Sequence, residues 1–102
     1  MTLSLSEFKV EFLRGLADNT RLKIIESLKD SERTVSQLVD EIGSSQSNIS
    51  THLKLLKTTG IVKSRNEGKY VYYSLRDETI YEFLSKLEDM LILMRRKALE
   101  GL

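Results

Sequence analysis

Apolar residues in the first 43 positions recur at steps of three and four residues, which places them on one face of a helix. Three segments show this pattern: residues 5–16, 20–29 and 35–42. Ser4 and Thr34 each begin a Ser/Thr-x-x-Glu/Gln sequence, whose side chains satisfy free backbone N–H groups at a helix start. Three adjacent residues are good caps for the second helix: Asp18, Asn19 and Thr20. Gly43 suits the left-handed residue that commonly ends a helix, here the third.

The serine-rich stretch at residues 44–50 begins a fourth helix. Ser44 or Ser45 can accept a hydrogen bond from the free backbone N–H groups of its first turn. On a helical wheel the apolar residues share one side: Ile49, Leu53 and Leu56. The opposite side carries small or polar side chains: Ser47, Thr51, Lys54 and Thr58. This helix therefore has one face for a core and one polar face.

Two runs rich in β-branched and aromatic residues follow, at residues 61–65 and 70–75. They flank residues 66–69, in which Gly68 can supply the positive φ of a tight connection. Asp77 then caps a final helix with a sustained apolar stripe: Ile80, Phe83, Leu84, Leu87, Met90, Leu91, Met94 and Ala98. The pattern predicts a hairpin and a long last helix.

The predicted order is α-α-α-α-β-β-α, a mainly α (α+β) fold. A short capped helix, a turn through Gly43 and a helix with an apolar inner face form a helix-turn-helix, and the hairpin makes it winged. No repeat or linker interrupts the sequence, and we expect residues 1–102 to form a single winged helix-turn-helix domain.

Charge is distributed unevenly along the 102 residues, although the net charge is only +1. Residues 44–76 hold six basic side chains and one acidic one, while the rest of the chain is acidic. Such a concentration is expected of a nucleic-acid face, with a lysine-rich solvated surface as the alternative. The longest apolar run, residues 90–94, is too short to span a bilayer, and no secretory leader precedes it. We expect a cytoplasmic protein.

The polar face of the fourth helix has the composition expected for reading DNA. Small hydroxyl and amide side chains let a helix enter the major groove, where Gln46, Ser47 and Thr51 can meet base edges. Lys54 can meet phosphate from the same face. Gln46 and Ser47 have a second interpretation, in which they only extend the helix cap.

The predicted wing carries Arg65 and Lys69 on either side of its tip. They are candidates for backbone or minor-groove contacts, and equally for solvated charges that prevent strand pairing at an edge. His52, the single histidine, is expected to pack or to contact phosphate rather than to bind metal. Leu55 lies nearer the polar face than an apolar side chain should, and the pattern offers no reason for it.

Four stretches of the sequence resemble the ArsR/SmtB family of winged-helix transcriptional repressors: residues 16–25, 46–56, 60–62 and 65–75. The resemblance covers nearly the whole chain. It implies a homodimer joined by the first and last helices, and a recognition helix that carries Gln46, Ser47, Ser50 and Thr51 to the major groove. It also implies repression that an inducer, often a metal ion, relieves.

The sequence departs from the family where a metal would bind. By register the thiolate positions are Thr34 and Ser36, and the chain has no cysteine. The zinc positions of the last helices fall on four residues of which only the first can coordinate: Asp77, Thr79, Met90 and Leu93. We therefore expect no metal or other cofactor at these sites, and the inducer is unknown.

The first and last helices carry more apolar surface than one small domain covers: Phe8, Phe12, Phe83, Leu87, Leu91 and Met94. A two-fold dimer and an inverted-repeat operator in double-stranded DNA follow. An enzyme is disfavoured, because there is no phosphate-binding glycine loop and no acid pair set against a nucleophile. The remaining alternative is a winged helix that binds another protein.

Overall fold

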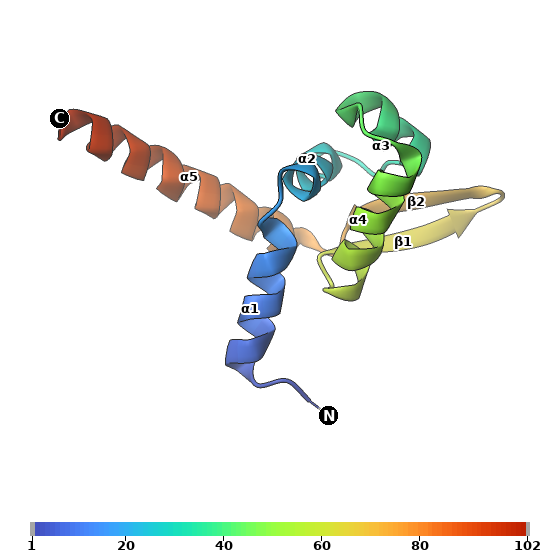
Figure 1. The fold of residues 1–102 in the computed structure, drawn as a ribbon, viewed down its shortest axis with the longest axis horizontal. Helices are drawn as coiled ribbons and strands as arrows, with labels where there is room; N and C mark the ends of the chain where they lie inside the picture. The colour runs from blue at the N-terminus through green and yellow to red at the C-terminus, as the bar shows by residue number, and fades with distance from the viewer. Residues whose placement is uncertain (1, 102) are drawn as a thin grey trace.

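The computed structural model describes residues 2–101 and has the predicted order of elements (Figure 1). The elements are α1 Leu5–Leu16, α2 Asn19–Leu28, α3 Val35–Ile42, α4 Gln46–Thr58, β1 Val62–Glu67, β2 Tyr70–Leu75 and α5 Glu78–Glu100. The mainly α winged helix-turn-helix is thereby confirmed. The predicted domain span of 1–102 includes two terminal residues that lie outside the described range.

Each helix begins at a residue whose side chain accepts a hydrogen bond from the third residue after it. The caps are Ser4, Asp18, Thr34, Ser45 and Asp77. Thr34 makes the full capping box with Gln37, and Gly43 ends the same helix with φ of 81°. These short-range bonds define the turn between α3 and α4, because they stop one helix and start the next within three residues.

The core lies where α2, α3 and α4 meet the base of the hairpin. Its largest fully buried side chains are all aliphatic: Ile24, Ile25, Leu38, Ile49, Leu53, Leu56 and Ile61. Among residues 2–101 no polar or charged residue is buried. The helix-turn-helix and the wing base therefore share one apolar core.

The hairpin is longer than the sequence pattern indicates. Strand β1 continues to Glu67, which pairs with Tyr70, so the loop contains only residues 68 and 69. Gly68 makes this possible because its φ of 60° suits the first position of a two-residue hairpin turn. At its base the hairpin gains another backbone partner, since Arg33 and Tyr73 exchange N–H to O bonds of 2.9 and 2.8 Å.

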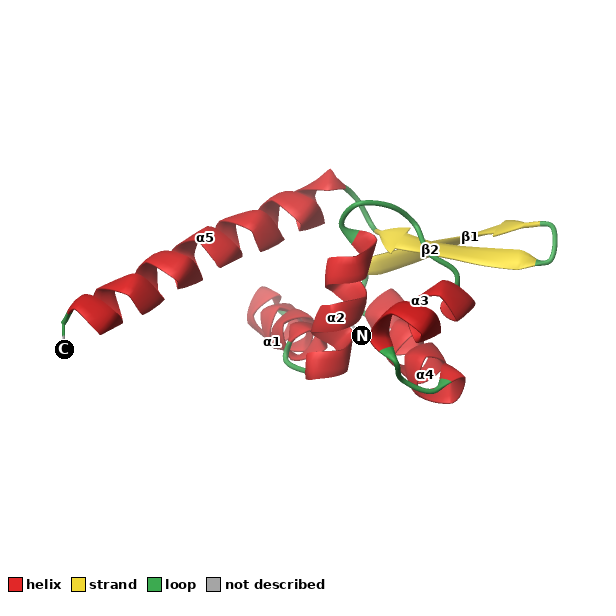
Figure 2. Cartoon of the chain, turned by 90° about the horizontal axis from the view of Figure 1, so that it is seen from above, coloured by secondary structure: helices red, strands yellow, loops and turns green. Residues whose placement is uncertain are grey.

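Helix α5 leaves the body on the side opposite to the hairpin (Figure 2). Only Ile80 and Leu84 of this helix are buried, and residues 88–100 are all exposed. Near its start, the Phe83 ring meets Phe12 of α1 edge to face, with centroids 5.8 Å apart. Among the described residues, the distal half of α5 thus has no buried side chain.

The capping box of α3 predicts a measurable cost of removing one hydroxyl. Thr34→Ala should lower the free energy of unfolding by about 1 kcal/mol, because the N–H of Gln37 loses its acceptor. Urea denaturation followed by circular dichroism measures this. Ser36→Ala, at an exposed position of the same helix, is the control and should change stability by less than about 0.5 kcal/mol. Equal losses in the two variants would contradict the role of the box.

Candidate nucleic-acid interface

Helix α4 has the two faces that its sequence predicts. Ile49, Leu53 and Leu56 are at most 1% exposed and form its inner side. The outer side is exposed and contains the predicted DNA-reading residues: Gln46, Ser47, Ser50, Thr51 and Lys54. Burial of the aliphatic stripe therefore orients these polar side chains outward.

The hydroxyl of Thr51 already has an acceptor within the helix. Its Oγ1 donates to the Ser47 carbonyl oxygen at 2.8 Å, which leaves the oxygen lone pairs and the methyl group to face outward. Ser45 caps the helix, and Asn48 donates from Nδ2 to the Ser44 hydroxyl at 2.7 Å. Among the described residues, the side chains of Gln46 and Ser47 take no part in these bonds.

The basic side chains around α4 differ in how they are held. Lys54 is exposed on the helix, whereas the Lys57 amine donates to the Ser64 hydroxyl of β1 at 2.7 Å and ties helix to wing. Lys69 lies in the hairpin loop, with its amine 5.5 Å from the centroid of the Tyr70 ring. Lys54 and Lys69 are consequently the accessible cations on the helix and at the wing tip.

Arg65 is held by two carboxylates. Its Nη2 and Nε donate to the two oxygens of Glu32 at 2.5 and 2.9 Å, and its Nη1 donates to Glu67 at 2.7 Å. The guanidinium also lies 4.7 Å from the centroid of the Tyr72 ring. These hydrogen bonds, that of Glu32 above all, raise the pKa of Arg65 further above its ordinary value. Its role as a DNA contact stays a prediction.

His52 packs at the corner between α1 and α2. Its Nδ1 lies 3.3 Å from Nη1 of Arg21, and its Nε2 lies 3.9 Å from an Asp18 oxygen. Arg21 also donates to the carbonyl oxygens of Gly15 and Arg14, so it closes the end of α1. No local sequence pattern marks Arg21, because its partners lie up to 31 residues away along the chain. Leu55 is 40% exposed on α4.

The predicted dimer surface lies along α1 and α5. Phe8, Phe83, Leu91 and Met94 are exposed, while Phe12 and Leu87 are half-buried. Beside them a groove of about 490 Å³ runs between α1, α2 and α5. Its apolar lining is mostly leucine: Leu13, Leu16, Leu22, Leu84, Leu87 and Leu91. The apolar surface is therefore continuous from one helix to the other.

Two of the family's metal positions hold residues that cap helices. Thr34 caps α3, and Asp77 caps α5 while it pairs with Arg76 at 3.2 Å. Within the described part of the chain no three His, Cys, Asp or Glu side chains come together to hold an ion. Among the same residues, no helix has the length and apolar character needed to cross a membrane. The expectation of a metal-free protein stays a prediction.

A helix-turn-helix closed by a two-stranded wing defines the class of winged helix-turn-helix proteins. Residues 18–64 match the model of the bacterial regulatory proteins of the arsR family. The chain belongs to this family, as its sequence predicts.

Two solved structures and one curated relative illustrate the likeness. The chain is 45% identical over 74 residues to a cadmium resistance transcriptional regulatory protein, the CadC homolog of Staphylococcus aureus, covering 72% of this chain and 61% of that one. It superposes on Mycobacterium tuberculosis Rv0081 with a TM-score of 0.89 and 29% identity, covering 96% and 99% of the two chains.

The second structure is the homodimeric winged helix-turn-helix DNA-binding domain Mb0332 from Mycobacterium bovis. Its TM-score is 0.77 at 26% identity, with 96% of this chain and 87% of that chain covered. The chain spans only 58% to 61% of the length of the first three curated relatives it matches.

Two carboxyl groups with lowered pKa values, one beside the wing and one on α3, predict how the stability of the fold depends on pH. Arg65 holds the pKa of Glu32 below its ordinary value of 4.5, and hydrogen bonds from Ser27 and Arg33 do the same for Glu41. A carboxyl with a lowered folded-state pKa stabilises the fold above its unfolded pKa, and that contribution is lost as the pH falls through the folded value. Stability should therefore decline as the pH drops from about 5 to 3.

Glu32→Gln should make this decline shallower, because one of the titrating groups is gone. Urea midpoints measured at half-unit steps of pH test this. Glu82→Gln, which changes an exposed residue of α5, serves as the control and should keep the parent's profile. A Glu32→Gln profile parallel to that of the parent would show that Glu32 does not couple folding to pH.

Proposed function

We propose that this chain is a sequence-specific, homodimeric DNA-binding repressor of transcription. The observation that carries the proposal is the outer face of α4, which presents small polar side chains beside a basic wing. A winged helix that binds another protein normally presents an apolar or acidic surface there. The names of the matched relatives, transcriptional regulators and repressors, support the same function.

Gln46, Ser47, Ser50 and Thr51 read base edges in the major groove. Gln46 can pair with adenine through two hydrogen bonds, and serine hydroxyls can donate to or accept from either strand. Thr51 differs, because its proton is already donated to Ser47, and it offers an acceptor and a methyl group. It therefore suits an amino group or the methyl of thymine.

Lys54 and Lys69 neutralise phosphates on either side of this contact. Because phosphates are the same in every sequence, these two residues supply affinity and salt dependence without discrimination. A steep fall of affinity with salt separates DNA binding from the alternative, protein binding by the wing and helix.

The second copy of the chain covers the apolar faces of α1 and α5. The residues that we assign to this interface are Phe8, Phe12, Phe83, Leu87, Leu91 and Met94. A two-fold dimer presents two α4 helices, so the operator is an inverted repeat with half-sites about 34 Å apart. Such a regulator acts in the cytoplasm, has no catalytic residue and uses no metal at the family's usual positions.

Substitutions on α4 separate base recognition from electrostatic attraction to the phosphates. Ser47→Ala and Thr51→Ala should each lower the ratio of operator affinity to random-duplex affinity, because a base contact is lost. The loss corresponds to about 1 to 3 kcal/mol of binding free energy. Lys54→Ala should weaken both affinities alike. Fluorescence anisotropy with an operator selected from a random pool measures the ratio, with Lys86→Ala on α5 as the control. An unchanged ratio for Ser47→Ala and Thr51→Ala would refute this assignment of the face.

Leu91→Glu tests the dimer, because Leu91 is 50% exposed and its loss should leave the monomer folded. A charge inside an apolar two-fold interface is buried without a partner in both copies, so the variant should be monomeric and lose tight operator binding. Light scattering at micromolar concentration measures the mass. Lys86→Glu adds a negative charge off the apolar stripe of the same helix and should stay dimeric. A monomeric parent protein would overturn the dimer.

A further inference from the structure

Arg65 occupies the first position of β1 beyond the last backbone tie between the hairpin and the body. That tie is the pair of bonds between Arg33 and Tyr73, and Tyr73 pairs across the hairpin with Ser64. From Arg65 and its partner Tyr72 to the loop, the hairpin has no further backbone partner among the described residues. A two-stranded ribbon of this kind is marginally stable and needs a side-chain brace to keep its direction.

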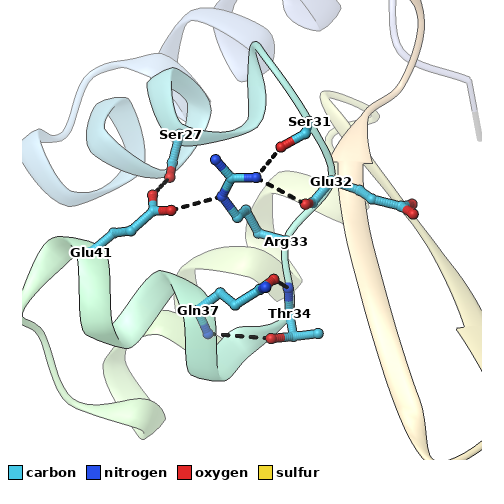
Figure 3. Close-up of polar contacts among 7 residues, drawn as sticks. All are labelled: Ser27, Ser31, Glu32, Arg33, Thr34, Gln37 and Glu41. Atoms are coloured by element: carbon cyan, nitrogen blue, oxygen red, sulfur yellow. Dashed lines mark hydrogen bonds and ion pairs between the residues drawn. The ribbon is translucent and has the colours of Figure 1, made fainter.

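The anchor of that brace is Glu32, in the loop between α2 and α3. Its neighbour Arg33 is held on both sides, by the backbone bonds to Tyr73 and by a 2.7 Å pair between its Nε and Glu41 of α3. Glu41 accepts in turn from the Ser27 hydroxyl of α2, and Arg33 donates to the Ser31 hydroxyl (Figure 3). The loop that carries Glu32 is thereby bound to α2, α3 and β2.

We propose that Arg65 is a positioning residue, which sets the angle of the wing against α4 through Glu32 rather than by binding a phosphate. The proposal rests on the proposed function, since the angle matters only if wing and helix meet one duplex. With the brace in place, Lys69 at the wing tip reaches the backbone while α4 lies in the groove.

Charge argues against a phosphate contact by Arg65 itself. The guanidinium and its two carboxylates, Glu32 and Glu67, sum to one negative charge, and the nearby Lys63 brings that sum only to zero, so the cluster offers no net positive charge to a phosphate. To bind DNA, Arg65 would have to leave a bidentate pair, and Glu32 would then face the duplex without its partner. Wing attraction falls instead to lysines that bear no such pair, above all Lys69.

A charge swap separates the two roles. Arg65→Glu alone should weaken operator binding at least about tenfold, because the brace becomes a repulsive pair. The double variant Glu32→Arg with Arg65→Glu, built on and compared with Glu67→Gln so that the new carboxylate meets no like charge from its own strand, keeps the total charge of Glu67→Gln and restores an ion pair at the same place. It should recover affinity to within about threefold and keep the salt slope of log K, because no phosphate contact was lost.

The proposal is overturned if the double variant binds as weakly as Arg65→Glu. In that case the salt slope of log K should also fall by about 1, the change expected when one phosphate contact is lost. Lys69→Ala gives the reference for such a loss, since it removes a phosphate contact. Glu67→Gln is the matched control. Glu67 also bonds Arg65, but from the same strand, so its loss leaves the wing joined to Glu32, and affinity should change less than about twofold.

Hydrogen exchange of the free protein tests the brace without DNA. Amide protons of residues 66–71 should exchange faster in Arg65→Glu and in Glu32→Gln, and at the parent rate in the double swap. Unchanged exchange in both single variants would overturn the brace, even if the swap variant failed to fold. If the parent bound no duplex in a salt-dependent way, the proposed function would fail, while these exchange rates would still decide whether Arg65 holds the wing.

Discussion

The packing of the aliphatic stripe of α4 against the other helices is the constraint on which the structure depends. Ile49, Leu53 and Leu56 are removed almost completely from water, and each contributes about 1.5 to 3 kcal/mol by that burial. Because an α-helix turns 100° per residue, burying this stripe leaves the polar side of α4 exposed. The caps at Thr34 and Ser45 position the helix, but the core decides which side faces out.

The loop between α2 and α3 has a role beyond connecting two helices. Glu32 and Arg33 are adjacent, yet they reach in different directions, one to the wing and the other to α3. Ion pairs therefore join the helix-turn-helix to the wing, in addition to the apolar core that the two share. Such exposed pairs contribute little to stability, and their value lies in the orientation that they impose.

The distal half of helix α5 shows the opposite situation, because residues 88–100 are all exposed in the described structure. A helix whose apolar residues lie on several sides is normally buried, and here Met90, Leu91, Ile92 and Leu93 are all about half exposed. Nearer its start, α5 is held by Leu84 in the core, by the ring contact between Phe83 and Phe12, and by a 3.1 Å ion pair between Glu88 and Lys29 at the end of α2. In the proposed dimer, a second copy of the chain covers this surface.

The sequence by itself determined the elements, their order and the two faces of α4, because caps, apolar spacing and glycine conformations are local properties. Thr34, Asp77 and Gly43 have their predicted roles, and the hairpin differs only in a loop shortened by two residues. The sequence also identified the family. Its candidate contacts between α4 and DNA remain predictions.

Only the tertiary structure decided which charges are free. Arg65 and Lys69 are equivalent in the sequence, but folding brings Glu32, 33 residues away, against Arg65 and leaves Lys69 at the tip. In the same way it places Arg21 against His52 and the end of α1. The physical reason is that an ion pair requires closeness in space, and for residues so distant along the chain the packing of the helices and the pairing of the strands set that closeness.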